Sequence, residues 1–335
     1  MACYIGLLAR ESFQLVQREG LTWLQSAALA RIPWLIHGFS TRQASPPRPT
    51  NTDRPPTDFN LGLTANSRPR QVEANRRRFY RALARDLTAA SLRQTHSATV
   101  YQVVRSGSGA PHGLPERDGL EYGPAGWPLP DWAPKALTSA SGDALLTSER
   151  SVLLTVRTAD CLPVLLADTR LRVIAAVHAG WRGALARIIE KTVSELRRLF
   201  NSRPEDLKAA LGPGIGPCCY EVGEEVVEAF QGRFAESDRF FHKPAPVAEP
   251  SRSDLRYALL FEIQAPPGHG RPPVKTRLHL DLAAAARAQL LNAGLDDTAI
   301  HPSGYCTACR PDLFFSHRRD GSRAGRMMAA IAVRA

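Results

Sequence analysis

Two short apolar segments separated by a polar turn stand in the middle of the chain. Residues 162–167 and 173–177 are rich in Val, Leu and Ile, and the polar sequence Asp168-Thr169-Arg170 lies between them. Runs of this length and composition are typical of β-strands, so the pattern predicts a strand, a tight turn and an antiparallel strand. This hairpin is the strongest single constraint that the sequence places on the fold.

The predicted hairpin brings a thiol and an imidazole together. A turn centred on Thr169 and Arg170 places Cys161 directly opposite His178, although Thr-Arg is not a favoured turn sequence and the register could slip by one residue. Directly opposite residues have Cβ atoms about 4.5 to 5.5 Å apart. At that separation the two side chains can ligate one metal ion, or the imidazole can deprotonate the thiol.

The chain is long enough for a large α/β domain. It has 335 residues, 44% of them hydrophobic, and no clear central linker, so we expect one domain over residues 1–335. Three segments rich in Pro and Gly, at 43–58, 106–134 and 243–273, are expected to be surface-loop inserts.

Both helices and a further strand are predicted around the hairpin. Periodicity and capping residues predict helices over 69–85, after Trp181, over 222–230 and from Asp281 to Gly294, with a strand at 98–104. Strands alternating with helices, together with a hairpin, predict a mixed-sheet α/β or α+β fold.

Composition bears on the location and the partners of the protein. The sequence contains no run of about 18 apolar residues and no signal-peptide pattern, and its six cysteines form no even framework, so a cytoplasmic protein without a membrane span is expected. The net charge is +11, but the arginines are scattered. Nucleic acid is therefore not an expected partner, whereas a small acidic substrate such as phosphate is compatible with the charge.

A third candidate ligand precedes the predicted strand at 98–104. With His96, the pair Cys161 and His178 becomes a set of two nitrogens and one thiolate, which suits a catalytic zinc ion with an open fourth position. Spacing alone does not select His96, because a lone histidine beside a strand is more often a surface or core residue.

Several further motifs have weaker interpretations. His301, Cys306, Cys309 and His317 could form a second metal site, although a single Cys-x-x-Cys is weak evidence. The segment 212–217 is better explained as a rigid turn than as a phosphate-binding loop, because its two prolines lack N–H donors. Residues 318–321 contain Asp-Gly, a strong hairpin-turn signal.

Seven motifs, taken together and in order, resemble the YfiH/laccase-domain family of purine nucleoside phosphorylases, also labelled multicopper polyphenol oxidase or peptidoglycan editing factor. They are HGFSTR (37–42), QTH (94–96), DALLT (143–147), TADCLP (158–163), VHAGWRG (177–183), LGPGIGPCCYEV (211–222) and FSHRRDG (315–321). The resemblance implies a single-domain layered α/β/β/α sandwich with mixed sheets. It also implies a metal at His96, Cys161 and His178, which selects His96 where spacing does not. The chain departs from the family after Arg42, where a Gly-Gly turn is usual and the first insert begins here.

The activity implied by the resemblance is zinc-dependent phosphorolysis of adenosine, guanosine, inosine and 5′-methylthioadenosine, with adenosine deamination as a side activity. Purine nucleosides and inorganic phosphate would be its partners, and copper could replace zinc. Asp160, beside Cys161, is a candidate for orienting a ligand or transferring a proton. The candidate substrate-binding residues are Arg42, Arg182, Arg318 and Arg319, because a guanidinium group binds phosphate through a planar fork. The neighbouring hydroxyl of Ser40 is added to this set.

Three other functions stay open from the residues themselves. Cys161 with His178 as base could form a metal-free hydrolase acting on amides or cell-wall peptides. A multicopper oxidase needs many histidines, whereas the chain has nine and no His-x-His pair. A non-catalytic protein that binds polyanions is the third alternative.

Overall fold

The computed structural model describes residues 12–43, 58–65, 67–105, 116–117, 120–124, 140–243 and 278–335. The predicted inserts at 43–58, 106–134 and 243–273 lie largely outside these ranges. Within them, no helix is both long enough and apolar enough to cross a membrane.

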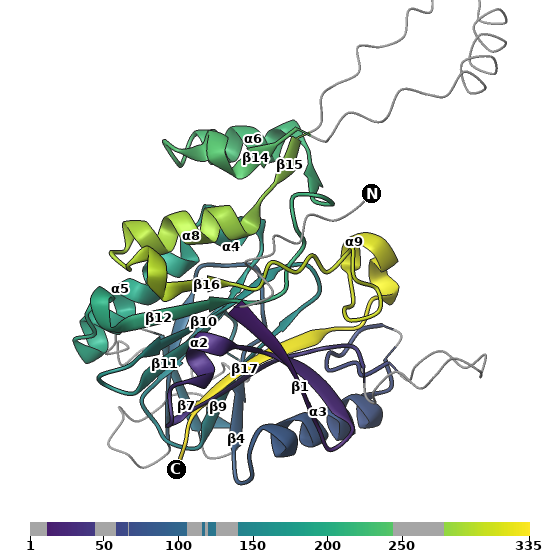
Figure 1. Cartoon of the computed structure of the whole chain (residues 1–335), viewed down its shortest axis with the longest axis vertical. Coiled ribbons are helices and arrows are strands. Elements are labelled where there is room, and N and C mark those ends of the chain that lie inside the picture. The colour runs from purple at the N-terminus through teal and green to yellow at the C-terminus, as the bar shows by residue number, and fades with distance from the viewer. Residues whose placement is uncertain are drawn as a thin grey trace, which may run out of the picture.

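Two mixed β-sheets form the centre of the molecule (Figure 1). The six-stranded sheet has the order β1 (Phe13–Arg18), β2 (Leu21–Ser26), β3 (Leu35–Ser40), β17 (Met327–Val333), β9 (Val152–Thr158) and β4 (Thr88–Ser91). The eight-stranded sheet has the order β16 (Ile300–Pro302), β12 (Leu207–Leu211), β10 (Leu162–Asp168), β11 (Val173–Ala179), β8 (Ala144–Thr147), β5 (Val100–Arg105), β7 (Leu120–Pro124) and β6 (Glu116–Arg117). A small third sheet has the order β13 (Glu221–Val222), β15 (Leu278–Leu280) and β14 (Phe241–His242).

Helices cover the outer faces of both large sheets. One buried cluster packs α3 (Pro69–Leu83) against the six-stranded sheet, and another packs α5 (Ile188–Phe200) and α8 (Leu282–Asn292) against the eight-stranded sheet. A third cluster contains inward-facing residues of both sheets, such as Leu165 and Ile331. The predicted α/β/β/α layering is therefore confirmed.

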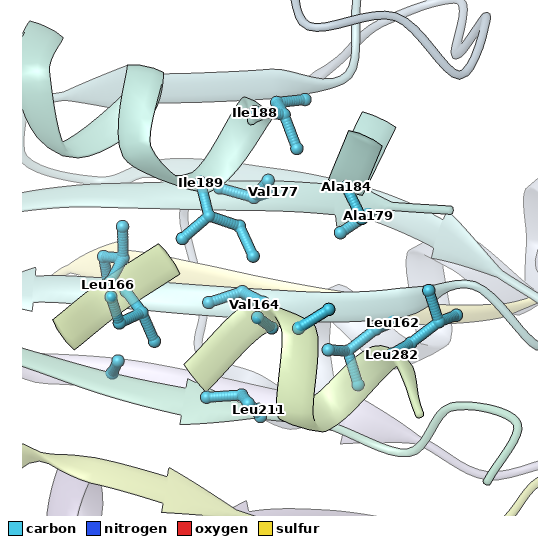
Figure 2. Close-up of a cluster of buried hydrophobic side chains, with 14 of the residues drawn as sticks. Leu162, Val164, Leu166, Val177, Ala179, Ala184, Ile188, Ile189, Leu211 and Leu282 are labelled. Atoms are coloured by element: carbon cyan, nitrogen blue, oxygen red, sulfur yellow. The ribbon is translucent and has the colours of Figure 1, made fainter. Parts of the chain in front are cut away.

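The central hairpin is buried on both sides. Every residue of β10 and β11 is buried. On β10, Leu162, Val164 and Leu166 belong to the cluster under the helices, and Figure 2 shows Leu162 near Leu282. Leu165 belongs to the cluster between the sheets. This double burial explains why the sequence shows continuous apolar runs instead of alternation.

The predicted register of the hairpin is wrong. His178 pairs with Pro163, so Cys161 stands opposite Gly180 if the register is continued past the last paired residues. The turn is displaced because the Asp168 carboxylate accepts hydrogen bonds from the backbone N–H groups of Arg170 and Leu171. The error amounts to two positions along β11. Side chains alternate between faces with a period of two, so Cys161 and His178 still share one face, as diagonal neighbours.

The predicted helices are confirmed, with two changes. Asp281 caps α8 by accepting a hydrogen bond from the Ala284 N–H at 2.9 Å, and Gly294 follows the helix with φ of 96°. The helix after Trp181 is divided into α4 (Trp181–Leu185) and α5, because Arg187 adopts a left-handed conformation between them. The helix predicted over 222–230 is α6 (Glu224–Gln231).

The Asp-Gly motif near the C-terminus does not form the expected hairpin turn. Residues 317–320 form the short helix α9 (His317–Asp320). The Ser316 hydroxyl accepts a hydrogen bond from the Arg319 N–H at 3.2 Å and so caps this helix. A side-chain cap at the first turn therefore overrides the local turn signal. The remaining α-helix among the described residues is α2 (Ala27–Ala30), which follows β2.

His37, in the first of the seven motifs, has a structural role. It lies on β3, is 1% exposed, and its Nε2 accepts a hydrogen bond from the Ser26 N–H at 3.0 Å. Burial lowers the pKa of this imidazole to about 4, with a smaller opposing influence from the backbone of Ser26. The side chain is therefore neutral in the folded protein at neutral pH.

We predict that His37 makes the fold acid-sensitive. The unfolded chain binds a proton at this residue below pH about 6.5, whereas the folded chain binds it only near pH 4, so stability falls as the pH decreases through that window. A pKa difference of this size corresponds to about 3 kcal/mol. Chemical unfolding at several pH values should show a shallower loss in His37→Gln, which keeps an acceptor for Ser26. Equal pH profiles for the variant and the wild type would contradict the prediction.

Candidate metal centre

Two histidines and one cysteine converge at one end of the hairpin. The potential ligand atoms of His96, Cys161 and His178 all lie within 4.8 Å of one another. His96 Nε2 is 3.7 Å from Cys161 Sγ, and the centroids of the two imidazole rings are 5.0 Å apart. The structure therefore brings together all three of the predicted ligands.

Three separate segments supply these side chains. His178 lies on β11, Cys161 directly precedes β10, and His96 lies in the turn before β5 with a positive φ of 59°. A Cβ atom on Gly180 would lie 2.8 Å from His96 Cδ2 and 2.9 Å from Cys161 Sγ. The close approach of His96 and Cys161 therefore requires a residue without a side chain at position 180.

The buried carboxylate of Asp143 holds two of the ligands. Asp143 directly precedes β8 and is fully buried. Its Oδ1 accepts hydrogen bonds from His178 Nδ1 at 2.8 Å and from the His96 N–H at 3.1 Å. Its Oδ2 accepts from the N–H and the hydroxyl of Ser97 at 2.7 and 2.8 Å, and from the Thr95 N–H at 3.1 Å. One carboxylate thus fixes the 95–97 turn and the His178 ring.

Asp143 also decides which nitrogen of His178 is available. Burial raises the pKa of the Asp143 carboxyl, but hydrogen bonds from His178 and Ser97 outweigh burial and lower the pKa to about 2. An ionised carboxylate can only accept, so His178 Nδ1 carries a proton and donates it. Nε2 is then the nitrogen that is free to ligate, as in metal sites where a carboxylate orients a histidine.

Cys161 and His178 form a charged pair. Burial raises the pKa of the Cys161 thiol, but the charge and hydrogen bond of His178, together with the hydrogen bond of His96, lower it to about 6. Burial lowers the pKa of His178, but the Cys161 charge and the Asp143 hydrogen bond raise it to about 9. The thiol is therefore largely ionised at neutral pH, which is the form that binds metals.

This donor set fits a zinc ion. Zinc binds imidazole nitrogen and thiolate sulfur, and three protein ligands leave a fourth tetrahedral position open, which is the usual catalytic arrangement. His96 is exposed whereas His178 is 4% exposed, so the centre opens to solvent on the His96 side. Copper accepts the same donor types, and the geometry alone does not choose between the two metals.

Asp160 joins the centre to the C-terminal part of the chain. Its carboxylate accepts hydrogen bonds from the Thr307 hydroxyl and from the Arg318 N–H, both at 2.6 Å, and its carbonyl accepts from the Ile215 N–H. Asp160 has φ of 88°, which is uncommon for a residue with a side chain. These contacts tie the residue before Cys161 to the segments around Thr307, Arg318 and Ile215.

Three of the predicted substrate-binding residues make extensive contacts within the protein. Arg42 forms an ion pair with Asp58 at 2.6 Å and donates to the Pro311 carbonyl. The buried Ser40 hydroxyl accepts a hydrogen bond from the Met328 N–H at 2.9 Å. Arg319 pairs with Asp320 and donates to three carbonyls, those of Thr307, Ala308 and Phe314.

The other two arginines lie on the side of the centre marked by Tyr220. The Arg318 guanidinium stacks over the Tyr220 ring at 5.2 Å, and that of Arg182 stacks over the Trp181 ring at 4.2 Å. Burial and the negative charge of Cys161 raise the pKa of Tyr220 to about 12, against the opposing influence of Arg318 and Arg182. Tyr220 therefore lies close enough to respond to both arginines and to Cys161.

Sequence analysis missed three residues of this region. Asp143 and Tyr220 lie within the recognised motifs but received no role. The sequence does contain one signal for Asp143, because this acidic residue directly precedes an apolar strand. Arg326 received no mention, and among the described residues no carboxylate pairs with its half-buried guanidinium, which donates to the Ala324 and Gly325 carbonyls. Burial lowers the pKa of Arg326, while Cys161 and Asp160 oppose this shift.

The possible metal cluster of His301, Cys306, Cys309 and His317, for which the sequence offers weak evidence, does not form in the part of the chain that the structure describes. His301 and His317 do not join Cys306 and Cys309 in either group of potential ligands found among the described residues. His301 lies on β16, where its buried Nε2 has no hydrogen-bond partner within the described part of the chain, and His317 begins α9.

Comparison with known proteins gives a consistent family. Residues 36–334 match the family model described as multi-copper polyphenol oxidoreductase laccase. A purine nucleoside phosphorylase YlmD from Geobacillus stearothermophilus is 31% identical over 95% of this chain and 97% of its own length. An adenosine deaminase RL5 from an unknown prokaryotic organism is 35% identical over 56% of this chain and 61% of its own length. The crystal structure of YlmD from G. stearothermophilus superposes with a TM-score of 0.66 at 26% identity, covering 97% of this chain and all of that one.

We predict that Asp143→Asn weakens metal binding by about 10- to 100-fold, the usual effect of removing a partner that orients a metal ligand. A carboxamide NH₂ would face the N–H and O–H donors of the 95–97 turn, so stability should also fall, by about 2 to 3 kcal/mol. Competition with a chromophoric chelator measures the affinity.

Asp168→Asn is the matched control, because Asp168 is equally buried and caps the other end of the hairpin. It should lower stability and leave metal affinity unchanged. An Asp143→Asn protein with wild-type affinity would contradict the assigned role.

Proposed function

The chain belongs to the family described as multi-copper polyphenol oxidoreductase laccase, and from this premise we propose that it is a zinc-dependent purine nucleoside phosphorylase with adenosine deaminase side activity. The proposed substrates are adenosine, guanosine, inosine and 5′-methylthioadenosine. Phosphate would convert each of them to the free base and a ribose 1-phosphate, which keeps the methylthio group in the last case. Relatives named purine nucleoside phosphorylase and adenosine deaminase support both activities.

One observation carries the proposal. The donor atoms of His96, Cys161 and His178 lie within 4.8 Å of one another, and the cationic side chains of Arg182 and Arg318 lie close enough to affect Tyr220 beside this centre. A cation-binding site that stands next to arginines suits a substrate pair of which one member is an anion.

His96, Cys161 and His178 would hold the zinc ion. Bound there, zinc would supply Lewis-acid chemistry, through which an oxygen is polarised or a water made more acidic. The centre described here contains two histidines, whereas multicopper oxidation requires a mononuclear copper and a trinuclear cluster with many more. The described ligands therefore support a centre with a single metal ion.

The protein groups around the centre suit phosphorolysis. In this reaction a phosphate oxygen forms a bond to ribose C1′ while the bond from C1′ to the purine nitrogen breaks, and the purine leaves with the electron pair and gains a proton. Arg318 and Arg182 would hold the phosphate by charge and hydrogen bonds. The pKa of about 12 keeps the Tyr220 hydroxyl protonated, so it would donate a hydrogen bond to substrate oxygen. Asp160 would position Arg318 through its backbone.

The other two predicted arginines, Arg42 and Arg319, would have a supporting role. Arg42 and Arg319 already satisfy their guanidinium groups with carboxylates and carbonyls, so we propose that they support the loops around the site. Binding phosphate with either of them would require breaking those contacts. Arg326, without a described carboxylate partner, is a further candidate for an anion.

A metal-free cysteine hydrolase is the second candidate function, and one observation favours it. Cys161, His178 and Asp143 form a chain of thiolate, imidazole and carboxylate in which the thiol pKa is lowered to about 6. This is the arrangement of a nucleophile, a base and a group that orients the base. The two functions differ in their need for metal, because a chelator should abolish the first and leave the second intact.

We predict that the zinc-loaded protein converts adenosine to adenine and ribose 1-phosphate only when phosphate is present. Chromatography with mass detection identifies the products, and inosine would show the deaminase activity as well. His178→Ala should abolish both reactions by removing a ligand. Absence of turnover with all four nucleosides would contradict the proposal, and thiol-dependent hydrolysis of an amide in the presence of a chelator would favour the cysteine hydrolase.

We predict that Arg318→Ala raises the KM for phosphate by about 10- to 100-fold, which matches the loss of one hydrogen bond to a charged group. Its KM for the nucleoside should change much less. Arg323→Ala is the control, because Arg323 is an exposed arginine just after α9, the helix that contains Arg318. Steady-state kinetics at varied phosphate test both variants. Equal phosphate KM values in the two variants would exclude Arg318 from phosphate binding.

A further inference from the structure

Four cysteines form a second cluster outside the centre described above. Cys218 and Cys219 lie between β12 and β13, and Cys306 and Cys309 lie between β16 and α9. The four sulfur atoms all lie within 4.8 Å of one another. Cys309 Sγ is 3.5 Å from Cys218 Sγ and 3.4 Å from Cys219 Sγ. Two loops about ninety residues apart in the sequence thus present two thiols each.

The separations match those of a tetrahedral sulfur site. Zinc–sulfur bonds of about 2.3 Å place the four sulfurs of a tetrahedron about 3.8 Å apart. The observed sulfur–sulfur distances of 3.4 and 3.5 Å, with all others below 4.8 Å, lie on both sides of that value. Small side-chain adjustments would therefore complete the geometry. Four thiolates fill the coordination shell of zinc, which is characteristic of structural sites.

The backbone around Cys306 favours a thiolate at this position. The Gly216 N–H donates to Cys306 Sγ at 3.2 Å, and the N–H groups of Ala308 and Cys309 also donate to this sulfur. Hydrogen bonds to the charged form of a group stabilise that form. The first cysteine of the single Cys-x-x-Cys, at 306–309, thus has the hydrogen-bonding environment of a metal ligand.

The two loops are already docked against each other. Gly214 and Cys306 form a β-bridge, and the Thr307 N–H donates to the Gly214 carbonyl at 2.9 Å. A Cβ atom on Gly216 would lie 3.2 Å from Cys306 Cβ and 3.4 Å from Cys218 Sγ, closer than most such contacts. A binding site held in place by the fold in this way requires little reorganisation when an ion enters.

We propose that Cys218, Cys219, Cys306 and Cys309 bind one structural zinc ion that joins the 212–219 loop to the 303–309 loop. Soft sulfur donors exclude magnesium and calcium. Cys309 is equally close to two other sulfurs, as a tetrahedral site requires, whereas a disulfide would select one partner at about 2.05 Å. The Cys218 side chain is exposed and gives the ion a path into the site.

This second site would stabilise the first through Thr307. The Thr307 hydroxyl donates to the Asp160 carboxylate at 2.6 Å, and Asp160 directly precedes Cys161. The zinc-bound loop would therefore hold the residue that positions Arg318. The assignment of this second site does not depend on the reaction that the first centre catalyses.

Metal content and X-ray absorption test the proposal. Protein reconstituted with zinc under reducing conditions should contain two zinc ions per chain. Cys161→Ser/His178→Ala, which lacks the first centre, should keep one, with four sulfur neighbours at about 2.3 Å in its zinc-edge spectrum. Cys218→Ser changes the exposed thiol and should weaken binding at this site by at least tenfold in chelator competition, without loss of fold. Cys161→Ser alone should leave it unchanged.

Several outcomes would overturn the assignment. They are a Cys161→Ser/His178→Ala protein without zinc, a zinc spectrum with nitrogen or oxygen neighbours in place of sulfur, and iron with inorganic sulfide in the purified protein. A disulfide among these four cysteines, found by peptide mapping of protein purified without air, would also contradict it. Each of these results comes from protein that keeps all four cysteines of the second cluster, so none depends on whether the Cys218→Ser variant folds.

Discussion

The carboxylate of Asp143 is the interaction on which the arrangement of the candidate metal centre depends. It is fully buried, and its two oxygens accept hydrogen bonds from the 95–97 turn and from His178. Burying a charge is costly unless hydrogen bonds compensate it, and here several donors do so. Because those donors come from segments about eighty residues apart in the sequence, one ionised side chain fixes two ligands relative to each other.

The central hairpin provides the frame for this interaction. Both of its strands are buried on two sides, so their backbone positions are set by packing against helices and against the second sheet. Cys161 and Gly180 lie at its open end, and the missing side chain of Gly180 leaves room for the His96 ring and the Cys161 sulfur. A rigid scaffold thus carries ligands that stand where regular structure ends.

The chain uses many of its arginines internally, which changes how its positive charge should be interpreted. Arg319 donates to three carbonyls and pairs with Asp320, and Arg42 bridges Asp58 and the Pro311 carbonyl. These guanidinium groups tie loops together. A net charge of +11 therefore overstates the number of cations available to an anionic ligand. Arg182 and Arg318 differ from Arg319 in stacking on aromatic rings.

The sequence determined the features that depend on local patterns. Apolar runs defined β10 and β11, and the capping residues Asp281 and Gly294 defined α8, because strands and helix ends leave periodic or positional signals. The meeting of Cys161 with His178 also followed from the sequence. This prediction holds although the predicted register is wrong, because a shift of two positions along a strand leaves each side chain on the same face of the sheet.

Only the tertiary structure decided which distant residues meet. His96 could be selected by resemblance but not by spacing, and the role of Asp143 depends on the turn that it binds, which no local pattern reveals. Cys306 and Cys309 were assigned histidine partners because those are near in sequence, whereas the fold brings Cys218 and Cys219 from about ninety residues away. Contacts across such separations arise from how sheets and loops pack, and a single sequence carries no direct signal for them.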